Sequence, residues 1–379
     1  MNRHLCLQVF TLMLLLAILR NASAAASEQA DPPVLSLHSP VPFQVIQREG
    51  FVPARAHAHQ PGGPELGFAR VPFSAAFPHA AKSIEYRIVP REGAFGGGTD
   101  WTPLEGKVEK DEFHASARVA AGGWYRLEVR ARDAERVIAA GSVEPIGVGE
   151  VFVVAGQSYA TNCNDERLKV ADPAGRVVAF DLHGKWRVAH DPQPAPDNSD
   201  GGSIWPAFGD ALLPGVRVPV GLVNVAVGGT ASKEWMPGTP LFERLSAVAG
   251  QVGRFRAVLW QQGESDVIAK TSTKQYVANL RTIREQAAKA WGFDPPWLLA
   301  KSTLHPTVYN DPEGEGRIRA AIDELCRLPG FHHGPDTDVL GGPNRGGAQS
   351  RHHFSGQGQR GAALLWFASV WNELNPTTP

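Results

Sequence analysis

Short, continuously apolar runs in the second half of the chain constrain the fold more than any other feature. A strand with one solvent-facing side alternates apolar and polar residues, whereas a strand buried on both faces does not. The runs therefore predict strands of a parallel sheet that is covered by helices on both sides. They are Val151–Ala155, much of Val218–Val227, Ala257–Trp260 and Trp297–Ala300.

Helical patterns lie between or after these runs. In residues 273–291 the apolar positions recur every three to four residues, so they line one helix face. Residues 316–327 and 357–374 also read as helices. Strands that alternate with helices predict an open α/β sheet. Residues 189–202 are polar and rich in Pro and Asp, and we expect an exposed loop there.

The first half of the chain has a different sequence pattern. From about Pro33 to Ile146 the segments are short and separated by Gly and Pro, and Trp124–Arg130 alternates as a half-buried strand does. Several short strands of this kind predict a small β-sandwich. With 379 residues the chain has room for two domains. We expect an accessory β-sandwich over residues 25–147 and an α/β domain over residues 148–379.

Residues 1–24 have the pattern of a signal peptide. Arg3 precedes the apolar stretch Leu5–Leu19, and Ala22-Ser23-Ala24 fits an A-x-A cleavage site. The stretch is short for a membrane span, so we expect a secreted or periplasmic protein with no stable span after signal removal. A retained N-terminal anchor is the alternative. In an oxidising compartment Cys163 and Cys326 can pair, and two separate thiols are an equally open alternative.

The charge and the histidine pattern of the chain bear on whether it binds nucleic acid or metal. The formal net charge is -1, without the basic stripe of a nucleic-acid-binding protein. The paired histidines lack the neighbouring ligands of a closed metal site, so we expect no metal.

Polar and glycine residues directly follow the apolar runs. In an open parallel sheet, ligands bind outside the carboxyl ends of the strands. A hydroxyl, a glycine turn, an amide and carboxylate cluster, and an imidazole should therefore share one edge of the sheet. They belong to Gly156-Gln157-Ser158, Gly228-Gly229-Thr230, residues 261–266 and Thr303-Leu304-His305.

Four blocks in this order resemble SGNH hydrolases of the sialate O-acetylesterase and plant-type carbohydrate esterase branch. The third block is the most specific, because it is similar to the W-x-Q-G-E-S-D motif of that branch. The resemblance spans roughly residues 148–371 and implies a flavodoxin-like three-layer α/β fold and serine esterase chemistry without a cofactor. The blocks are residues 151–158, 226–230, 260–266 and 353–355.

The resemblance assigns roles residue by residue. Ser158 would be the nucleophile and His353 the general base, as in other serine acyl-transfer enzymes. The oxyanion hole would combine the backbone amide of Ser158, that of Gly229 or Gly228, and the side chain of Gln262. Two further residues of the third block are expected to hold its loop in place: Glu264 and Asp266.

The last block departs from the family pattern, which usually reads D-x-x-H. Ser350 stands three residues before His353, where the orienting aspartate is expected. Asp336 or Asp338 could supply the carboxylate, Ser350 or a backbone carbonyl could orient the ring, or activity could be lost. His352 competes for the base role, but neighbouring side chains are expected to point in different directions. His305 is expected to line the substrate site or to be a satisfied loop residue.

These expectations combine into one function. We expect an exported serine esterase that removes acetyl or similar short acyl groups from an acetylated oligo- or polysaccharide. A catalytically inactive carbohydrate-binding pseudo-esterase is the alternative, motivated by the missing aspartate. An α/β-hydrolase lipase is disfavoured, because Ala160 replaces the last glycine of the G-x-S-x-G elbow.

Overall fold

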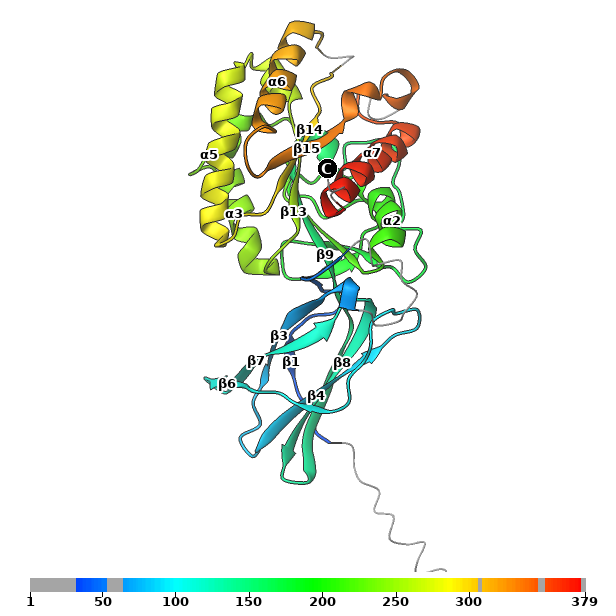
Figure 1. Cartoon of the computed structure of the whole chain (residues 1–379), viewed down its shortest axis with the longest axis vertical. Coiled ribbons are helices and arrows are strands. Elements are labelled where there is room, and N and C mark those ends of the chain that lie inside the picture. The colour runs from blue at the N-terminus through cyan, green and yellow to red at the C-terminus, as the bar shows by residue number, and fades with distance from the viewer. Residues whose placement is uncertain (1–31, 53–63, 306–308, 347–351, 376–379) are drawn as a thin grey trace, which may run out of the picture.

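The computed structural model describes residues 32–52, 64–305, 309–346 and 352–375. The predicted signal peptide and Ser350 lie outside these ranges. Figure 1 shows two lobes, a lower one made of β-strands and an upper one in which helices flank a sheet. Within the described residues, none of the helices combines the length and the apolarity that a membrane crossing requires.

The upper lobe is built on a parallel sheet. Its strands are β9 (Arg136–Gly156), β12 (Val220–Asn224), β13 (Ala257–Gln261), β14 (Trp297–Lys301) and β15 (Phe331–Asp336), in the spatial order β12-β9-β13-β14-β15. In chain order this is 2-1-3-4-5, the order of flavodoxin-like doubly wound sheets. An antiparallel hairpin of β10 (Val177–Phe180) and β11 (Trp186–Val188) extends the sheet beyond β12. The predicted mixed α/β fold is confirmed.

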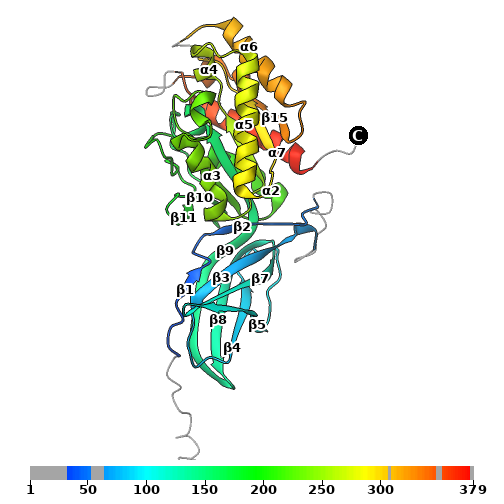
Figure 2. The ribbon, with the colours of Figure 1, turned by 90° about the vertical axis from the view of Figure 1, so that its left-hand side faces the viewer.

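Alternate residues of the apolar runs face opposite layers of helices. Phe152 and Val154 of β9 share a hydrophobic cluster with α2 (Trp205–Val216) and α7 (Gly356–Leu374). Val151 and Val153 share the other cluster with three helices on the opposite face of the sheet. Figures 1 and 2 show these layers. The three helices are α3 (Pro240–Val252), α5 (Thr273–Trp291) and α6 (Pro312–Leu325).

The helix predicted over residues 273–291 is α5. Its first turn is capped by the Ser272 hydroxyl, which accepts a hydrogen bond from the Gln275 N–H at 3.2 Å. It ends at Gly292, whose φ of 73° lies in the left-handed region that favours glycine. The helices α6 and α7 also lie where the sequence predicts them.

The lower lobe contains two sheets. Buried side chains of both belong to one hydrophobic cluster, which continues into the upper lobe on the side of α2 and α7. One sheet has the order β1 (Leu37–Ser39), β3 (Phe68–Ala76), β7 (Glu112–Ala120), β6 (Gly106–Glu109). The other contains β5 (Thr102–Pro103), β4 (Ser83–Pro90), β8 (Gly123–Asp133) and the first part of β9, with β2 (Val45–Gln47) beside β9.

The strand β9 runs through both lobes. Its first part pairs with β8, and its last part is central in the parallel sheet. The boundary expected between residues 147 and 148 therefore falls inside a continuous strand. A buried ion cluster lies at the same level: the Glu150 carboxylate accepts hydrogen bonds from Arg48 Nε and Arg256 Nε, each at 2.7 Å.

Candidate active site

A cavity of about 520 Å³ lies at the carboxyl ends of the parallel strands. It is lined by residues that follow β9, β12, β13 and β14, together with the turn that precedes α7. The structure thus brings Ser158, Gly228, Gly229 and His353 together. The wall also contains Gln157, Cys163, Ala231, Lys233, Glu234, Ser265, Ile268, Ala269, His305 and His352.

Ser158 begins the short 3-10 helix η3 (Ser158–Ala160) just after β9 ends. The strand ends at Gly156, where φ is +129° and an added Cβ would lie 2.1 Å from the Gln261 carbonyl oxygen of β13. Only glycine fits such a close approach of two backbones. Gln157 then joins the first and third blocks, because its side-chain oxygen accepts the Ser265 N–H at 3.1 Å.

The glycine turn after β12 lies against Ser158. A Cβ added to Gly228 would be 3.7 Å from Ser158 Cβ, and the Gly228 N–H donates to Asp197 Oδ2 at 3.0 Å. Gly229 has a φ of +71° and no heavy atom within 4 Å of an added Cβ. In the described part of the chain its N–H has no acceptor. Of the two glycines, Gly229 is therefore the one whose amide is available to a ligand.

Gln262 lies beneath the cavity wall and is fully buried. Its amide nitrogen donates to Asp266 Oδ2 at 2.6 Å and to the Thr230 carbonyl at 3.2 Å, and its oxygen accepts from the Tyr276 hydroxyl at 3.0 Å. Asp266 also accepts from the Ser232 N–H at 2.7 Å. Gln262 and Asp266 therefore tie the second and third blocks together. In this arrangement the Gln262 amide nitrogen donates within the protein and not into the cavity.

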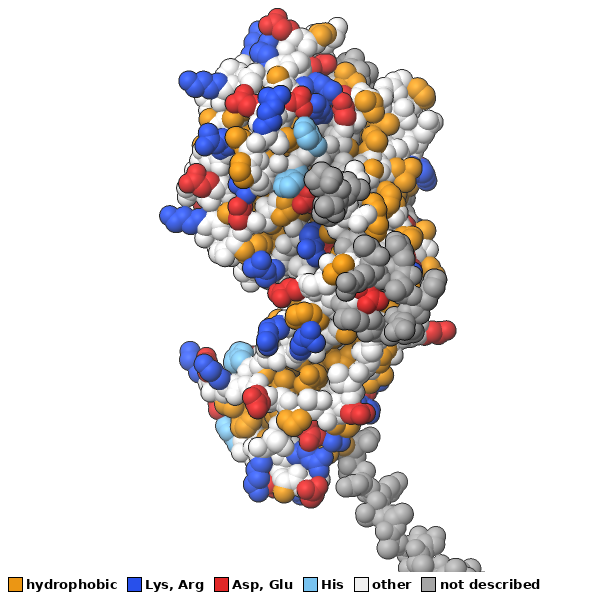
Figure 3. Space-filling view, viewed as in Figure 1, with side chains coloured by type: hydrophobic (Ala, Val, Ile, Leu, Met, Phe, Trp, Pro, Cys, Tyr) orange, Lys and Arg blue, Asp and Glu red, His pale blue; other side chains and the backbone are white. Residues whose placement is uncertain are grey.

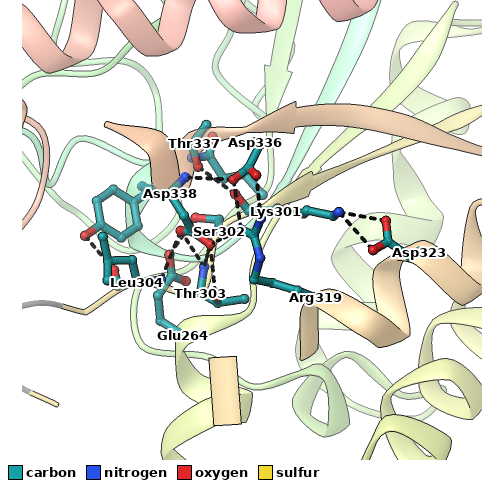
Figure 4. Close-up of polar contacts among 12 residues, drawn as sticks. Glu264, Lys301, Ser302, Thr303, Leu304, Arg319, Asp323, Asp336, Thr337 and Asp338 are labelled. Carbon is teal, nitrogen blue, oxygen red and sulfur yellow. Dashed lines mark hydrogen bonds and ion pairs between the residues drawn. The ribbon is translucent and has the colours of Figure 1, made fainter. Parts of the chain in front are cut away.

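Glu264 is the second buried carboxyl of the third block. Its Oε1 accepts a hydrogen bond from the Ser302 hydroxyl at 2.6 Å, and Oε2 has no partner among the described residues. Burial raises the pKa of Glu264 to about 8. The side chain lies behind the loop that follows β14 (Figure 4), so it supports that loop from inside the protein.

Asp336 and Asp338 lie at the end of β15, where both contact Arg319. Asp336 accepts from Arg319 Nη1 at 2.9 Å, and Asp338 from the same nitrogen at 2.8 Å. Asp338 also accepts the N–H groups of residues 303–304 at 2.9 and 3.0 Å. Figure 4 shows the Asp338 carboxylate beside Thr303 and the Asp336 carboxylate beside Arg319. Within the described ranges neither makes a hydrogen bond with His353, because their oxygens serve Arg319 and the loop instead.

Three imidazoles stack along one wall of the cavity. The ring centroids of His305 and His352 are 4.1 Å apart, and those of His352 and His353 are 3.9 Å apart. The expectation that neighbouring His352 and His353 point apart is wrong, because they lie in a turn and not in a strand, where side chains alternate. Burial lowers the pKa of His305, and it lowers the pKa of His352 to about 4. Both rings are neutral at neutral pH.

The remaining candidate chemistry is that of thiols and metals. Cys163 lines the cavity and accepts a hydrogen bond from the Thr161 hydroxyl at 3.2 Å. Cys326 follows α6, and both cysteines are free thiols, which settles the alternative that the sequence leaves open. Among the residues that the structure describes, no group of three His, Cys, Asp or Glu side chains is arranged to hold a metal ion.

Known proteins are similar to part of the upper lobe. Residues 148–295 match the family model described as "carbohydrate esterase, sialic acid-specific acetylesterase". A protein of Arabidopsis thaliana named as a probable carbohydrate esterase is 30% identical over 162 residues, which are 36% of this chain and 62% of that protein. The chain thus spans under two thirds of that relative.

Two further proteins are similar to this chain. The crystal structure of a carbohydrate acetylesterase from Xanthomonas citri has a TM-score of 0.54 and 16% identity, and the match covers 90% of this chain and 75% of that one. At this identity the likeness concerns the fold alone. A provisionally named S-adenosyl-L-methionine-dependent methyltransferase of Mycolicibacterium smegmatis is 26% identical over 54% of this chain and 68% of its own length.

Proposed function

We propose that this protein is a serine carboxylic ester hydrolase acting on acylated carbohydrate, because residues 148–295 match the family model described as "carbohydrate esterase, sialic acid-specific acetylesterase". The observation that carries the proposal is the cavity at the edge of the sheet. It is lined by the hydroxyl-bearing Ser158, an available backbone amide at Gly229 and the imidazole of His353. Attack, oxyanion binding and proton transfer are the three tasks of acyl transfer, and each has a candidate there.

The proposed reaction has two halves. His353 takes the proton of the Ser158 hydroxyl while the oxygen attacks the ester carbonyl, and the N–H groups of Ser158 and Gly229 bind the oxyanion. The tetrahedral intermediate collapses, and His353 returns the proton to the leaving sugar hydroxyl. Water, deprotonated by the same imidazole, then attacks the acyl carbonyl, and His353 returns the proton to the Ser158 oxygen as the carboxylic acid leaves.

The side chain of Gln262 can join the proposed oxyanion hole only if one of its hydrogen bonds changes. To join the oxyanion hole, its amide would have to exchange the Thr230 carbonyl, at 3.2 Å, for the substrate oxygen. The shorter bond to Asp266 could remain. Gln262 therefore contributes to the proposed reaction first by holding the second and third blocks in register.

The substrate is proposed to be an acetylated oligo- or polysaccharide outside the cytoplasm. The family description supports the carbohydrate, and the signal pattern of residues 1–24 supports secretion or export to the periplasm. Sequencing the N-terminus of the mature protein tests the export proposal, which expects Ala25 as the first residue. Acetate release from a panel of acetylated xylan, acetylated pectin and O-acetylated sialic acid tests the substrate.

Replacement of the nucleophile tests the reaction. Ser158→Ala should abolish hydrolysis of a chromogenic acetyl ester while the melting temperature stays unchanged. Ser265→Ala is the matched control, because this serine lines the same cavity and has no proposed role in the chemistry. Wild-type activity in the Ser158 variant would refute the assignment. A wild-type protein that binds acetylated polysaccharide and hydrolyses none of the esters would instead favour the inactive carbohydrate-binding alternative.

A further inference from the structure

The loop of residues 189–202 packs against the segment that carries Ser158. It was expected to be exposed, but most of its residues are half-buried or buried. Asn162, four residues after Ser158, holds it from two sides: its Oδ1 accepts the Gln193 N–H at 2.7 Å, and its Nδ2 donates to the Ser199 carbonyl at 3.0 Å. The Asn162 N–H also donates to the Ser199 hydroxyl at 3.0 Å. The loop is therefore fixed relative to the proposed nucleophile.

Asp197 extends from this loop to the glycine turn. Its Oδ1 accepts the Ser199 N–H at 3.1 Å and the Ser199 hydroxyl at 2.6 Å, and its Oδ2 accepts the Gly228 N–H at 3.0 Å. A hydrogen bond to an ionised carboxylate is about twice as strong as one between neutral groups. The contacts thus form a closed path from Ser158 through Asn162, the loop and Asp197 to the glycine turn.

The backbone amides of Gly228 and Gly229 in this turn have different surroundings. The Gly228 N–H points at Asp197, whereas the Gly229 N–H has no acceptor among the described residues and Gly229 lines the cavity. Gly228 itself lies close to Ser158, as the 3.7 Å separation of the added Cβ from Ser158 Cβ shows. With glycine at both positions, backbone sterics alone hold this turn weakly.

We infer that Asp197 is a positioning residue, which fixes the Gly228–Gly229 turn so that the Gly229 amide is aimed at the oxyanion. The inference rests on the proposed function. Asp197 acts through Gly228 and is proposed to contact neither the hydroxyl of the nucleophile nor the substrate. Losing one oxyanion donor typically lowers kcat by about 10² to 10³, so a misaimed donor should cost about 10- to 100-fold.

Three variants test the inference with an acetyl ester. Asp197→Ala should lower kcat about 10- to 100-fold while KM changes less than about threefold, because the lost interaction is one made in the transition state. Asp197→Asn should recover part of the loss, since its amide oxygen can still accept the Gly228 N–H. Asp200→Ala is the matched control: this exposed carboxylate of the same loop pairs with Arg167 at 3.2 Å and makes no contact with the glycine turn among the described residues, so kcat should stay near the wild-type value.

A second measurement separates positioning from a general loss of structure. A small alkylboronic acid forms a tetrahedral, negatively charged adduct on an active serine, so its affinity should fall in Asp197→Ala by about the factor lost from kcat. Affinity for free acetate and the melting temperature should stay within error.

The outcomes distinguish the two proposals. An active wild type with an Asp197→Ala kcat at the wild-type level overturns this inference alone, and so does a variant whose activity falls only in proportion to its folded fraction. A wild type that hydrolyses no ester overturns the proposed function as well.

Discussion

The hydroxyl of Tyr159 donates a hydrogen bond to the backbone carbonyl of His352 at 2.7 Å. The same ring packs edge-on against His353, with centroids 4.9 Å apart, and the Arg345 guanidinium lies over it at 4.6 Å. Tyr159 directly follows the proposed nucleophile, so one residue links the serine to the turn that carries the proposed base. We expect this link to compensate in part for the missing aspartate of the D-x-x-H motif, because it holds the backbone of the turn that carries His353.

Tyr159→Phe should therefore weaken catalysis without abolishing it. The variant keeps the ring packing but leaves the partly buried His352 carbonyl without this donor, which costs about 1–3 kcal/mol. We expect kcat for an acetyl ester to fall about tenfold with KM nearly constant, measured by steady-state kinetics. Tyr86→Phe, a buried tyrosine of β4 in the lower lobe, is the control and should leave kcat unchanged. An unaltered kcat in Tyr159→Phe would show that the hydrogen bond does not position the turn.

The stacked histidines allow a direct test of which ring is the base. His353→Asn should lower kcat by about 10³-fold or more, since the serine then lacks its proton acceptor. His352→Asn should lower it much less. Because the pKa of His352 is lowered to about 4, that ring becomes charged only as the pH falls toward 4. The pH–rate profile of His352→Asn should therefore match that of the wild type above about pH 5.

The reverse result would reassign the roles. If His352→Asn abolished activity and His353→Asn retained it, the base would be His352. The expected profile and the reassigned one differ in a second way, because a base with a pKa near 4 would give a rate that stays constant down to about pH 5. The pH dependence of kcat/KM in the wild type therefore checks the assignment independently of the variants.

Much of the upper lobe can be predicted from local sequence patterns, because burial on both faces gives the continuous apolar runs of β9, β12, β13 and β14. Helix α5 can be predicted from the sequence equally well, since its apolar stripe and the Ser272 cap are local features. The residues that line the cavity after β9 and β12 follow from the rule that ligands bind at the carboxyl ends of parallel strands. The match of residues 148–295 to the esterase family model confirms the resemblance over the first three blocks, residues 151–158, 226–230 and 260–266.

Features that depend on contacts between distant segments could not be predicted. The polar loop around Asp197 reads as exposed, because nothing local shows that Asn162 holds it. Asp336 and Asp338 precede His353 closely enough in the sequence to be candidate orienting acids. In the structure, however, both carboxylates contact Arg319 of α6, which the sequence does not reveal. The span of β9 through two lobes was missed because Gly and Pro between residues 141 and 149 suggest interruption, whereas the partners in space keep the strand continuous.

Glu264→Gln should change how stability depends on pH. The pKa of Glu264 rises from an ordinary value of 4.5 to about 8 in the folded protein, because burial disfavours its charged form. The folded state therefore binds the proton more tightly, and wild-type stability should decline as the pH rises from about 4.5 through about 8. Glutamine carries no such proton, so the variant should gain stability relative to the wild type over that window, by about 4 to 5 kcal/mol at its upper end.

Denaturant unfolding of both proteins at pH 4.5, 6.5 and 8.5 measures this difference. The control is Glu166→Gln on the surface, where the carboxylate is about half exposed and pairs with Arg360 at 2.7 Å. Its stability difference should stay within about 1 kcal/mol at every pH. A Glu264→Gln curve parallel to the wild-type curve would mean that the Glu264 carboxyl has an ordinary pKa in the folded protein.

Glu150→Gln tests whether the two lobes unfold as one unit. Burial by itself would raise the pKa of the Glu150 carboxyl, but Arg48 and Arg256 outweigh burial and hold it below its usual value. Replacing the carboxylate leaves the buried Arg48 guanidinium without its counter-ion, which should cost about 3–5 kcal/mol. Because the cluster lies on β9, which both lobes share, we expect a single cooperative transition that moves to lower denaturant concentration for both lobes.

Fluorescence and far-UV circular dichroism followed in the same titration measure cooperativity, and coincident curves are the expected result. The exposed Glu166→Gln variant again serves as control and should shift the midpoint little. A carboxyl with a lowered pKa stabilises the folded state at pH values above its ordinary pKa of 4.5, and this stabilisation is lost as the pH falls through the folded-state pKa. The stability penalty of Glu150→Gln should therefore shrink below about pH 4. Two separate transitions, with only the lower lobe destabilised, would show that β9 and its ion cluster do not couple the lobes.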